Sequence, residues 1–314
     1  MNKINSIRID FENQALNKVE YIDKMYELHQ ILFDYSSFLS KTGICKIEIS
    51  DNKLVMIFRN SDVKMICIQG DKRIACFDSF NFLSYEEEEL SMQFQLIEKG
   101  DVVFDIGGNY GWYSIHIAKK FPLNEIYTFE PVLNTFSTLK ENILINNVNN
   151  VKALNLGLSK EVGEFTFYCD PNLTVNASLS NVSDNSNAIE VSCKVEVLDR
   201  FVEINNINKI DFIKCDIEGA ELFALLGAKK SIIDFKPKIF IEMLRKWALK
   251  FDYHPNDIIL FLKEIGYKCY IIKEASLEEI LEVNELTIET NFVFLHNEKH
   301  YHLIDKLVNS KIHV

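Results

Sequence analysis

Short apolar runs alternate with stretches of helical periodicity from residue 101 to residue 296. The runs are rich in β-branched and aromatic residues, which predicts buried strands. The stretches between them carry apolar residues three or four positions apart, which predicts helices. Strands that alternate with helices form a parallel sheet covered on both faces. We therefore predict an α/β fold with a doubly wound, mainly parallel sheet of seven strands: 102–106, 125–129, 151–158, 210–215, 238–242, 267–273 and 291–296.

The first 84 residues show a different pattern and predict a separate N-terminal unit, 1–84, before a larger domain, 85–314. A short strand is expected at 4–11 and a helix at 19–39. That helix has an apolar stripe, which predicts a contact with the core or with a second copy of the chain. A small antiparallel β unit without evident chemistry is predicted from four segments: 44–50, 54–58, 63–69 and 73–77, with turns at 51–52 and 70–71.

Two further segments have polar character. The helix predicted at 85–98 begins with the acidic run Glu86 to Glu89. Carboxylates in a first helical turn interact favourably with the helix dipole, so we prefer this interpretation to an acidic site.

Strands predicted at 163–169 and 190–197 flank a polar stretch, 170–187, that is rich in Asn and Ser. Its length is typical of a surface loop that acts as a lid.

Composition narrows the class of protein. The chain of 314 residues is 47% hydrophobic and 25% charged, which is typical of a globular protein. Its net charge of −12 lacks the basic character of a nucleic-acid-binding protein. The seven cysteines are widely spaced and include no C-x-x-C pair, which favours free thiols over a zinc site or a disulfide framework. No apolar run has the length of a membrane span, and no signal-peptide core is present, so we expect a cytoplasmic protein.

A glycine-rich turn follows the predicted strand 102–106 and precedes a predicted helix. Gly107 and Gly111 allow positive φ and a close approach of a ligand to the backbone. Asn109 stands where a dinucleotide-binding turn has the glycine that its pyrophosphate needs. S-adenosylmethionine has no phosphate, and its ammonium and sulfonium charges suit the carboxylate of Asp105. The turn predicts a site for this cofactor, with a purely structural turn as the alternative; the candidate residues are Asp105, Gly107, Asn109, Gly111 and Tyr113.

The next predicted strand, 125–129, is followed by Glu130 and Pro131. A carboxylate at the end of the second strand is the group that hydrogen-bonds a ribose diol in nucleotide-binding folds. Two acids at two neighbouring strand ends favour a nucleoside cofactor over a structural turn. Glu130 and Pro131 are therefore added to the candidate cofactor-binding residues.

The strand predicted at 210–215 leads into a second acidic stretch. Alternation places Lys214 and Asp216 on one face, with Asp216 at the carboxyl end of the strand. Ligands bind at that edge of an open α/β sheet, so Asp216 and Glu218 are predicted to project toward the glycine-rich turn and the cofactor. The alternative is an ion pair between Lys214 and Asp216, with Glu218 as a helix-start acid.

Two more residues are candidates for catalysis. Glu242 ends the predicted strand 238–242 at the same edge, where it would orient a substrate hydroxyl or complete a metal site with Asp216. Two carboxylates alone do not make a magnesium site, so magnesium has no support and no metal ligand is assigned. His254 precedes a predicted helix and is either a general base or a surface residue. His116, on the helix after the turn, is interpreted as structural.

Three motifs in this order resemble the FkbM-type S-adenosylmethionine-dependent methyltransferases. They are the turn at 104–111, the Phe129-Glu130-Pro131 strand end and the stretch 211–221, and the resemblance covers about residues 90–296, including Asn142, Asn146 and the strand at 237–242. It implies a class I methyltransferase fold with a Rossmann-like sheet. It implies that Asp105, Gly107 and Gly111 shape the methionine end of the site, that Glu130 binds the ribose, and that Leu156 and Gly157 lie beside adenine.

The chain departs from the family pattern at two points. Gly108 stands where the family often has alanine, and Asn155-Leu156-Gly157 is an unusual end for the third strand. The resemblance does not extend to the first hundred residues.

The resemblance implies methyl transfer to a hydroxyl of a sugar, a glycan or a secondary metabolite. The protein must hold the acceptor oxygen in line with the sulfonium and remove its proton. We expect Asp216, or His254 if it folds over the pocket, to be the base, and Glu242 to orient the acceptor. A homo-oligomer is also compatible with the sequence.

Two other functions stay open at this point. One is a cofactor-binding module that has lost catalysis and serves a biosynthetic complex. The other is a nicotinamide-dependent sugar-modifying enzyme, although no Tyr-x-x-x-Lys pair accompanies the glycine-rich turn. Nucleic-acid methylation is disfavoured because the chain has neither an Asn/Asp-Pro-Pro-Tyr strand end nor a Pro-Cys nucleophile.

Overall fold

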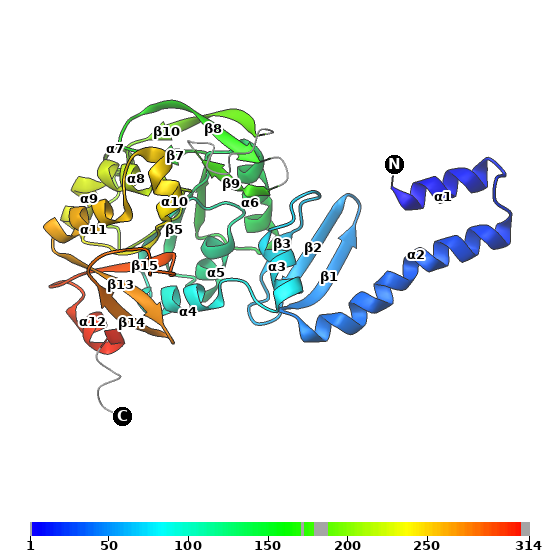
Figure 1. Cartoon of the computed structure of the whole chain (residues 1–314), viewed down its shortest axis with the longest axis horizontal. Coiled ribbons are helices and arrows are strands. Elements are labelled where there is room, and N and C mark those ends of the chain that lie inside the picture. Colours follow the sequence, from blue (N-terminus) through cyan, green and yellow to red (C-terminus); the bar gives the residue numbers. More distant parts are fainter. Residues whose placement is uncertain (1, 171–172, 179–187, 309–314) are drawn as a thin grey trace.

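A computed structural model describes residues 2–170, 173–178 and 188–308. Its centre is a sheet of eight strands (Figure 1). Five neighbouring strands are parallel, and the last three pair antiparallel. Across the sheet the order is β14 (Ser276–Ile280), β13 (Tyr267–Lys273), β15 (Asn291–His296), β12 (Lys238–Glu242), β11 (Phe212–Cys215), β4 (Val102–Ile106), β5 (Glu125–Phe129) and β6 (Val151–Leu154). The predicted doubly wound, mainly parallel sheet is confirmed.

The eighth strand, β14, was not predicted. It forms a hairpin with β13 through Glu274 and Ala275, which both have positive φ. A two-residue turn of this kind is normally signalled by Asn-Gly or Asp-Gly. Glu-Ala carries no such signal, so the sequence pattern does not reveal the hairpin.

Helices cover both faces of the sheet because its central strands are apolar on both sides. In β4, Val103 packs in one apolar cluster and Phe104 in the other, as alternation along a strand requires. Both side chains are fully buried. The helices after the glycine-rich turn and between the later strands are α5 (Trp112–Lys120), α6 (Leu133–Ile145), α7 (Leu198–Ile204), α8 (Glu221–Gly227), α9 (Lys229–Phe235), α10 (Arg245–Ala248), α11 (Pro255–Glu264) and α12 (Tyr301–Val308).

A second sheet lies beside the first. It consists of β7 (Gly157–Leu158), β10 (Ile189–Glu196), β8 (Gly163–Asp170) and β9 (Leu173–Ser178), in that order. The expected single strand at 151–158 is therefore wrong, since its two halves belong to different sheets. Asn155 fixes the break, because its Nδ2 donates to the carbonyl oxygens of Glu130 and Pro131 at 2.9 and 2.8 Å.

The polar stretch 170–187 is only partly a loop. Residues 173–178 form β9, which pairs antiparallel with β8. Residues 171–172 and 179–187 lie outside the described part of the chain, so the interpretation as a lid stays a prediction.

The N-terminal β unit is an antiparallel sheet of β1 (Ile44–Ser50), β2 (Lys53–Phe58) and β3 (Lys64–Ile66), as predicted. The outer edge of β3 is bonded to α6, because the amides of Lys64 and Ile66 donate to Asn146 and Asn142. The unit also shares an apolar cluster with the start of α5. The proposed division at residue 84 stays a prediction.

Two predicted strands of the N-terminal region are helices instead. Residues 73–77 contribute to α3 (Ala75–Phe82), which buries Ala75, Cys76 and Phe80 on one side. Residues 4–11 lie in α1 (Lys3–Glu12), which the side chain of Asn2 caps. The short apolar segments fit a helical period as well as an alternating one, and length alone does not separate the two.

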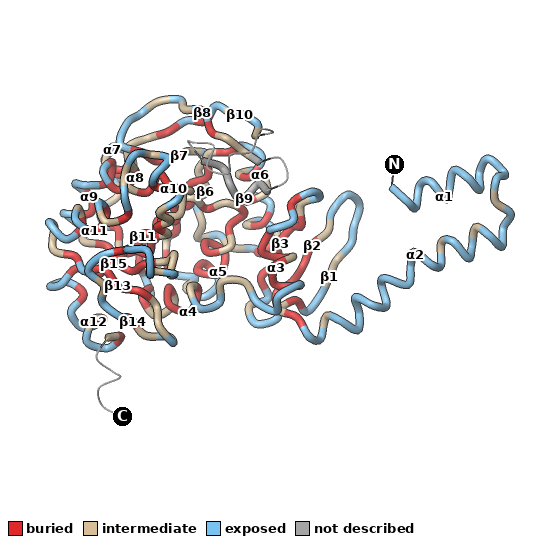
Figure 2. The backbone as a smooth tube through the Cα atoms, viewed as in Figure 1, coloured by how far each residue is buried: buried red, intermediate tan, exposed pale blue. Residues whose placement is uncertain are grey.

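The predicted helix at 19–39 is α2 (Lys18–Phe38), which starts with a capping box of Asn17 and Glu20. None of its residues is buried, so its apolar stripe does not join the core. Together, α1 and α2 form an arm that projects from the body of the molecule (Figures 1 and 2). Within the described residues, no helix is both long enough and apolar enough to cross a membrane.

Candidate active site

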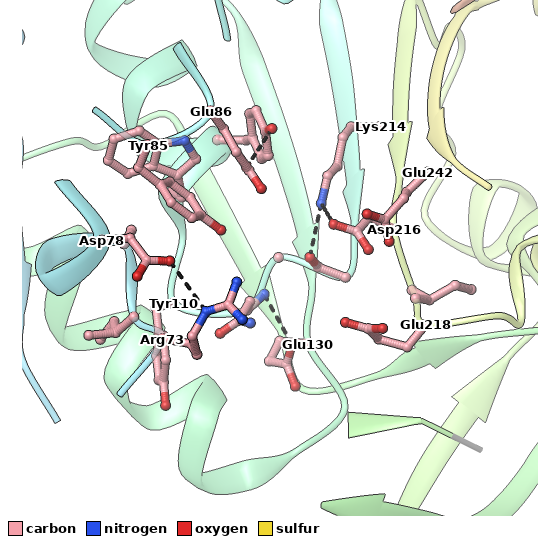
Figure 3. Close-up of a pocket in the computed structure, with 18 of the residues that line it drawn as sticks. Arg73, Asp78, Tyr85, Glu86, Tyr110, Glu130, Lys214, Asp216, Glu218 and Glu242 are labelled. Atoms are coloured by element: carbon pink, nitrogen blue, oxygen red, sulfur yellow. Dashed lines mark hydrogen bonds and ion pairs between the residues drawn. The ribbon is translucent and has the colours of Figure 1, made fainter. Parts of the chain in front are cut away.

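A cavity of about 430 Å³ opens at the carboxyl ends of β4, β11 and β12. The glycine-rich turn forms one side of it, and acidic residues after β11 and β12 form the opposite side (Figure 3). Eight of the predicted cofactor-binding and catalytic residues line the cavity: Gly107, Asn109, Tyr113, Glu130, Pro131, Asp216, Glu218 and Glu242. Gly108, where the chain departs from the family pattern, lines it as well.

The glycine-rich turn needs glycine at position 107 for two reasons. Gly107 has a φ of 83°, and a Cβ atom there would lie 1.9 Å from the carbonyl oxygen of Asp216. Asn109 also has positive φ, and its backbone amide donates to Glu130 Oε2 at 3.1 Å. Asn109 lines the cavity, and its side-chain Oδ1 is buried with no hydrogen-bond partner among the described residues. The turn therefore lies close to the loop after β11 and contains one buried acceptor without a partner there.

Gly111 and Asp105 support the turn from behind. Gly111 precedes α5 with a φ of 90°, and a Cβ atom there would meet the side chain of Leu139 at 2.6 Å. Asp105 is buried and accepts a 2.5 Å hydrogen bond from Ser114 Oγ. Neither residue lines the cavity.

Glu130 lies at the end of β5, on the side of the turn. Its Oε1 accepts a hydrogen bond from the backbone amide of Val132 at 2.9 Å. Burial raises the pKa of Glu130 to about 7, although the amides of Val132 and Asn109 act in the opposite direction. A carboxylate held in this way can accept hydrogen bonds from a diol.

Leu156 and Gly157 stand one layer behind the wall. Leu156 packs against the main apolar cluster. A Cβ atom on Gly157 would lie 3.5 Å from the Cβ of Pro131 and 3.4 Å from the ring of Phe167, two residues that do line the cavity. The sequence did not point to Phe167, which comes from the second sheet.

Lys214 is the buried cation of the site. Its Nζ atom lies 3.2 Å from Asp216 Oδ2 and 3.7 Å from Asp105 Oδ1. Burial alone would lower the pKa of Lys214, but the carboxylates of Asp216, Asp105 and Glu86 outweigh burial and raise it. The ion pair between Lys214 and Asp216, which the sequence analysis gave as the alternative to a role in the site, is therefore present, and Asp216 lines the cavity as well.

Glu218 and Glu242 face the cavity beside Asp216 (Figure 3). Burial raises the pKa of both glutamates well above the ordinary value, and the charge of Asp216 raises it further. Like-charged carboxylates that share a site retain protons that isolated carboxylates would lose. Glu218 and Glu242 therefore keep their protons more readily than exposed glutamates do.

Glu221, which the sequence did not single out, fixes the loop that carries Asp216 and Glu218. Its Oε1 accepts from the backbone amides of Ile217 and Gly219, both at 3.0 Å. Tyr253 donates to its Oε2 at 3.1 Å, and burial raises the pKa of Glu221 to about 7.

His254 is not brought to this cavity. It is the N-cap of α11, where its Nδ1 accepts from the amide of Asn256 at 3.2 Å. It lines another, more open cavity of about 910 Å³, which shares only Leu244 and Lys246 with the first. The expectation that His254 folds over the pocket is wrong, because Pro255 starts a helix that holds it elsewhere.

His116 is buried beside Ser61 and Trp112, and burial lowers its pKa to about 4.

The N-terminal region supplies one wall of the cavity, which the sequence analysis missed. Glu86 has a φ of 46° and precedes α4 (Glu87–Leu96), and its Oε2 accepts a 2.7 Å hydrogen bond from Tyr113. The interpretation of Glu86 as a first-turn acid is wrong, whereas the next three glutamates do occupy that turn. Other upstream residues in the wall are Met65, Arg73, Ile74, Ala75, Asp78 and Tyr85.

Magnesium gains no support from the geometry. Among residues 2–170, 173–178 and 188–308, no group of three or more His, Cys, Asp and Glu side chains is placed to hold a metal ion. The Lys214 ammonium already lies among the carboxylates.

Comparison with known proteins agrees with this geometry. The family model for the methyltransferase FkbM domain matches residues 105–269, which is more than half of the chain. The chain belongs to the FkbM methyltransferase family. The match begins at Asp105 and includes the glycine-rich turn, Glu130 and the acidic residues after β11 and β12. Membership implies S-adenosylmethionine as the methyl donor, and the sheet order with antiparallel β15 between β12 and β13 is that of the class I methyltransferase fold.

Two curated relatives show how far the similarity of this FkbM-family chain extends. Methyltransferase 1 of Beauveria bassiana is 28% identical over 159 residues, which are 45% of this chain and 64% of the relative. The hexuronic acid methyltransferase AglP of Haloferax volcanii is 27% identical over 147 residues, 47% of this chain and 58% of the relative. The chain thus covers less than two thirds of either relative.

Among solved structures, the methyltransferase FkbM from Methylobacillus flagellatus superposes with a TM-score of 0.41. The two are 14% identical, and the superposition covers 86% of this chain and 60% of the other.

Proposed function

We propose that the chain is an S-adenosylmethionine-dependent O-methyltransferase that acts on a hydroxyl of a sugar, a glycan or a secondary metabolite. The observation that carries the proposal is the arrangement of one cavity between the glycine-rich turn with Glu130 and the three acids Asp216, Glu218 and Glu242. The first side suits a nucleoside, and the second suits a hydroxyl that must lose its proton.

The residues present fit the cofactor. Gly107 lets the glycine-rich turn pass against the backbone of Asp216 at the cavity, and Asn109, which lines it, has a buried acceptor atom without a partner among the described residues. Glu130 would accept hydrogen bonds from the ribose. When bound, S-adenosylmethionine supplies a methyl group on a positively charged sulfur.

The chain's own residues would manage the acceptor proton. The side chain of Asp216 is 33% exposed, and its Oδ2 is held 3.2 Å from the Lys214 ammonium. We assign it the role of base. Glu242, whose pKa is raised by burial and by the charge of Asp216, would orient the acceptor hydroxyl. His254 has no role in this proposal.

The acceptor class rests on the relatives and on the acids. A relative named as a hexuronic acid methyltransferase supports a sugar hydroxyl as the acceptor. An ionised carboxylate only accepts hydrogen bonds, whereas a protonated one both donates and accepts, so the three acids suit a substrate rich in hydroxyl groups. The absence of a nucleic-acid partner and the cytoplasmic location stay predictions from composition.

Calorimetric titration with S-adenosylhomocysteine, with NAD as the control ligand, tests the cofactor. Binding of the first in the micromolar range and none of the second is expected. Binding of NAD alone would contradict the proposal and favour the nicotinamide-dependent alternative.

The Asp216→Asn variant then tests the catalytic role against hydroxylated sugar and glycan acceptors. Turnover should be lost while the affinity for S-adenosylhomocysteine stays nearly unchanged, because the amide cannot take the proton. A variant that keeps the wild-type rate would remove Asp216 from this role. A wild-type protein that binds S-adenosylhomocysteine but methylates none of a broad panel of acceptors would favour the alternative function, a cofactor-binding module that has lost catalysis.

A further inference from the structure

The amino-acid end of S-adenosylmethionine carries an ammonium and a carboxylate, so it needs partners of both charges in the cavity. Of the residues that the family resemblance gives to this end, only Gly107 lines the cavity, and it has no side chain. Asp105 is buried behind the turn, where it already contacts Ser114 and Lys214. The two charges therefore need partners from another part of the wall.

Arg73 and Asp78 form an ion pair in the upstream wall of the cavity. Arg73 Nε lies 3.6 Å from Asp78 Oδ2, and both residues line the cavity (Figure 3). This separation is longer than a hydrogen bond, so the guanidinium has no hydrogen-bond acceptor among the described residues. The side chain of Arg73 is 68% exposed and that of Asp78 is 12% exposed. The pair thus offers unused N–H donors beside a carboxylate, one charge of each sign.

The backbone of Arg73 is fixed beside the glycine-rich turn. Asp71, which is buried, accepts a hydrogen bond from the amide of Arg73 at 3.0 Å and another from the hydroxyl of Tyr110 at 3.3 Å. Tyr110 belongs to the turn itself. Ile74 and Cys76 come next in the chain and are fully buried in the apolar cluster that also contains Tyr110. The segment is therefore preorganised, and only the side chain of Arg73 has to adjust to a ligand.

Among the described residues, two other cations line the cavity, and neither suits the carboxylate as well. Lys214 is buried and lies 3.2 Å from Asp216 Oδ2. Lys246 follows β12, on the side of the acids, and its Nζ lies 5.0 Å from the ring centre of Trp247. A guanidinium binds both oxygens of a carboxylate with its planar fork, which an ammonium cannot do.

We propose that Arg73 binds the carboxylate of S-adenosylmethionine and that Asp78 binds its ammonium, an inference that rests on the proposed function. The guanidinium donates to the carboxylate of the ligand, and the ammonium of the ligand donates to Asp78, so both members of the ion pair keep a partner of opposite charge. Both residues precede residue 105, where the family match begins. This part of the cofactor site therefore lies outside the matched domain.

Calorimetric titration of the full chain with two ligands tests the role of Arg73. S-adenosylhomocysteine has the amino-acid end, whereas 5′-methylthioadenosine has the same nucleoside and sulfur without it. Arg73→Gln is expected to lower the affinity for S-adenosylhomocysteine about ten- to hundred-fold, because hydrogen bonds between charged groups are lost. The affinity for 5′-methylthioadenosine should stay unchanged, which also shows that the variant is folded. The matched control is Lys72→Gln, at the neighbouring exposed cation outside the cavity, which should change neither affinity.

Decarboxylated S-adenosylhomocysteine separates the two roles, because it keeps the ammonium alone. Asp78→Asn should weaken the binding of both this ligand and S-adenosylhomocysteine, whereas Arg73→Gln should weaken the binding of S-adenosylhomocysteine only.

Three results would count against the assignment. An Arg73→Gln variant that binds all three ligands as the wild type does, or that loses the same factor of affinity for each, would overturn it. A wild type that binds 5′-methylthioadenosine as tightly as S-adenosylhomocysteine would overturn it too, while the nucleoside site of the proposed function would stand. A wild type that binds none of the three would contradict the proposed function itself and the inference with it.

Discussion

The hydroxyl of Tyr113 donates a 2.7 Å hydrogen bond to Glu86 Oε2. Tyr113 lies in the first turn of α5, directly after the glycine-rich turn, whereas Glu86 belongs to the upstream segment that walls the cavity. One bond therefore joins the two sides of the site. Burial raises the pKa of Glu86, and the hydrogen bond from Tyr113 acts against that rise.

Replacing Tyr113 by phenylalanine should destabilise the protein by about 1–3 kcal/mol. The reason is that a largely buried carboxylate loses a donor while the ring is retained. Glu86→Gln keeps an acceptor for the hydroxyl of Tyr113, so it should lower the free energy of unfolding less than Tyr113→Phe does. Urea unfolding of the three proteins measures the difference, and equal stabilities would show that the bond has no structural role.

The carboxyl of Glu130 should make part of the stability depend on pH. Its pKa in the folded protein is about 7, above the ordinary 4.5, so the folded state binds the proton more tightly than the unfolded state. Its contribution is therefore fully present below pH 4.5 and is lost as the pH rises to about 7. The loss amounts to roughly 3 kcal/mol.

Glu130→Gln removes this titration. The stability of the wild type relative to the variant should decline as the pH is raised through that window, and then level off. Denaturant unfolding at a series of pH values measures it. Parallel curves for the two proteins would mean that Glu130 titrates in its ordinary range.

The departure of the chain from its family at Gly108 has a steric cause. A Cβ atom at Gly108 would lie 1.9 Å from Oγ1 of Thr128, a fully buried residue of β5. Gly108→Ala should therefore destabilise the protein by about 1–3 kcal/mol through overpacking.

The same contact predicts a rescue. Thr128→Ala removes the hydroxyl, so that the nearest remaining atom, Cβ of Thr128, would be 3.3 Å away. The double variant Gly108→Ala, Thr128→Ala should recover most of the lost stability. Thermal unfolding of the single and double variants completes a cycle, and additive losses would contradict the contact as the cause.

Lys214→Met should be the most damaging substitution in the site. It leaves the buried carboxylate of Asp105 and the neighbouring Asp216 without their cation, and breaking a buried pair in this way costs about 3–5 kcal/mol. Lys246→Met, at an exposed lysine of the same cavity, is the control and should change stability little.

The parts of the site that the sequence revealed are those in which a local pattern fixes the position. Asp105 and Glu242 lie at the ends of strands whose apolar character is plain, and Glu130 and Asp216 directly follow such strands. Parallel strands bring their carboxyl ends to one edge of the sheet. His254 lies outside any such pattern. Its location depends on the path of the chain after β12, which periodicity does not determine.

Backbone conformation accounts for other failures. Glu86, Glu274 and Ala275 all have positive φ, a conformation that the sequence signals only when glycine or asparagine occupies it. As a result, the sequence pattern predicted neither the position of Glu86 in the cavity wall nor the hairpin between β13 and β14. In α3 and α1, short apolar segments satisfied two periods at once, and tertiary packing decided between them.

The upstream wall has a consequence for how this protein can diversify. The family match starts at Asp105, yet Arg73, Asp78, Tyr85 and Glu86 line the same cavity from positions before it. Substitutions in that segment alter one face of the cavity and leave the glycine-rich turn and Glu130 untouched. The selectivity of the cavity can thus change through this one segment. Exchanging residues 73–86 between relatives, with Arg73 and Asp78 kept, is expected to change the range of substrates that the cavity accepts.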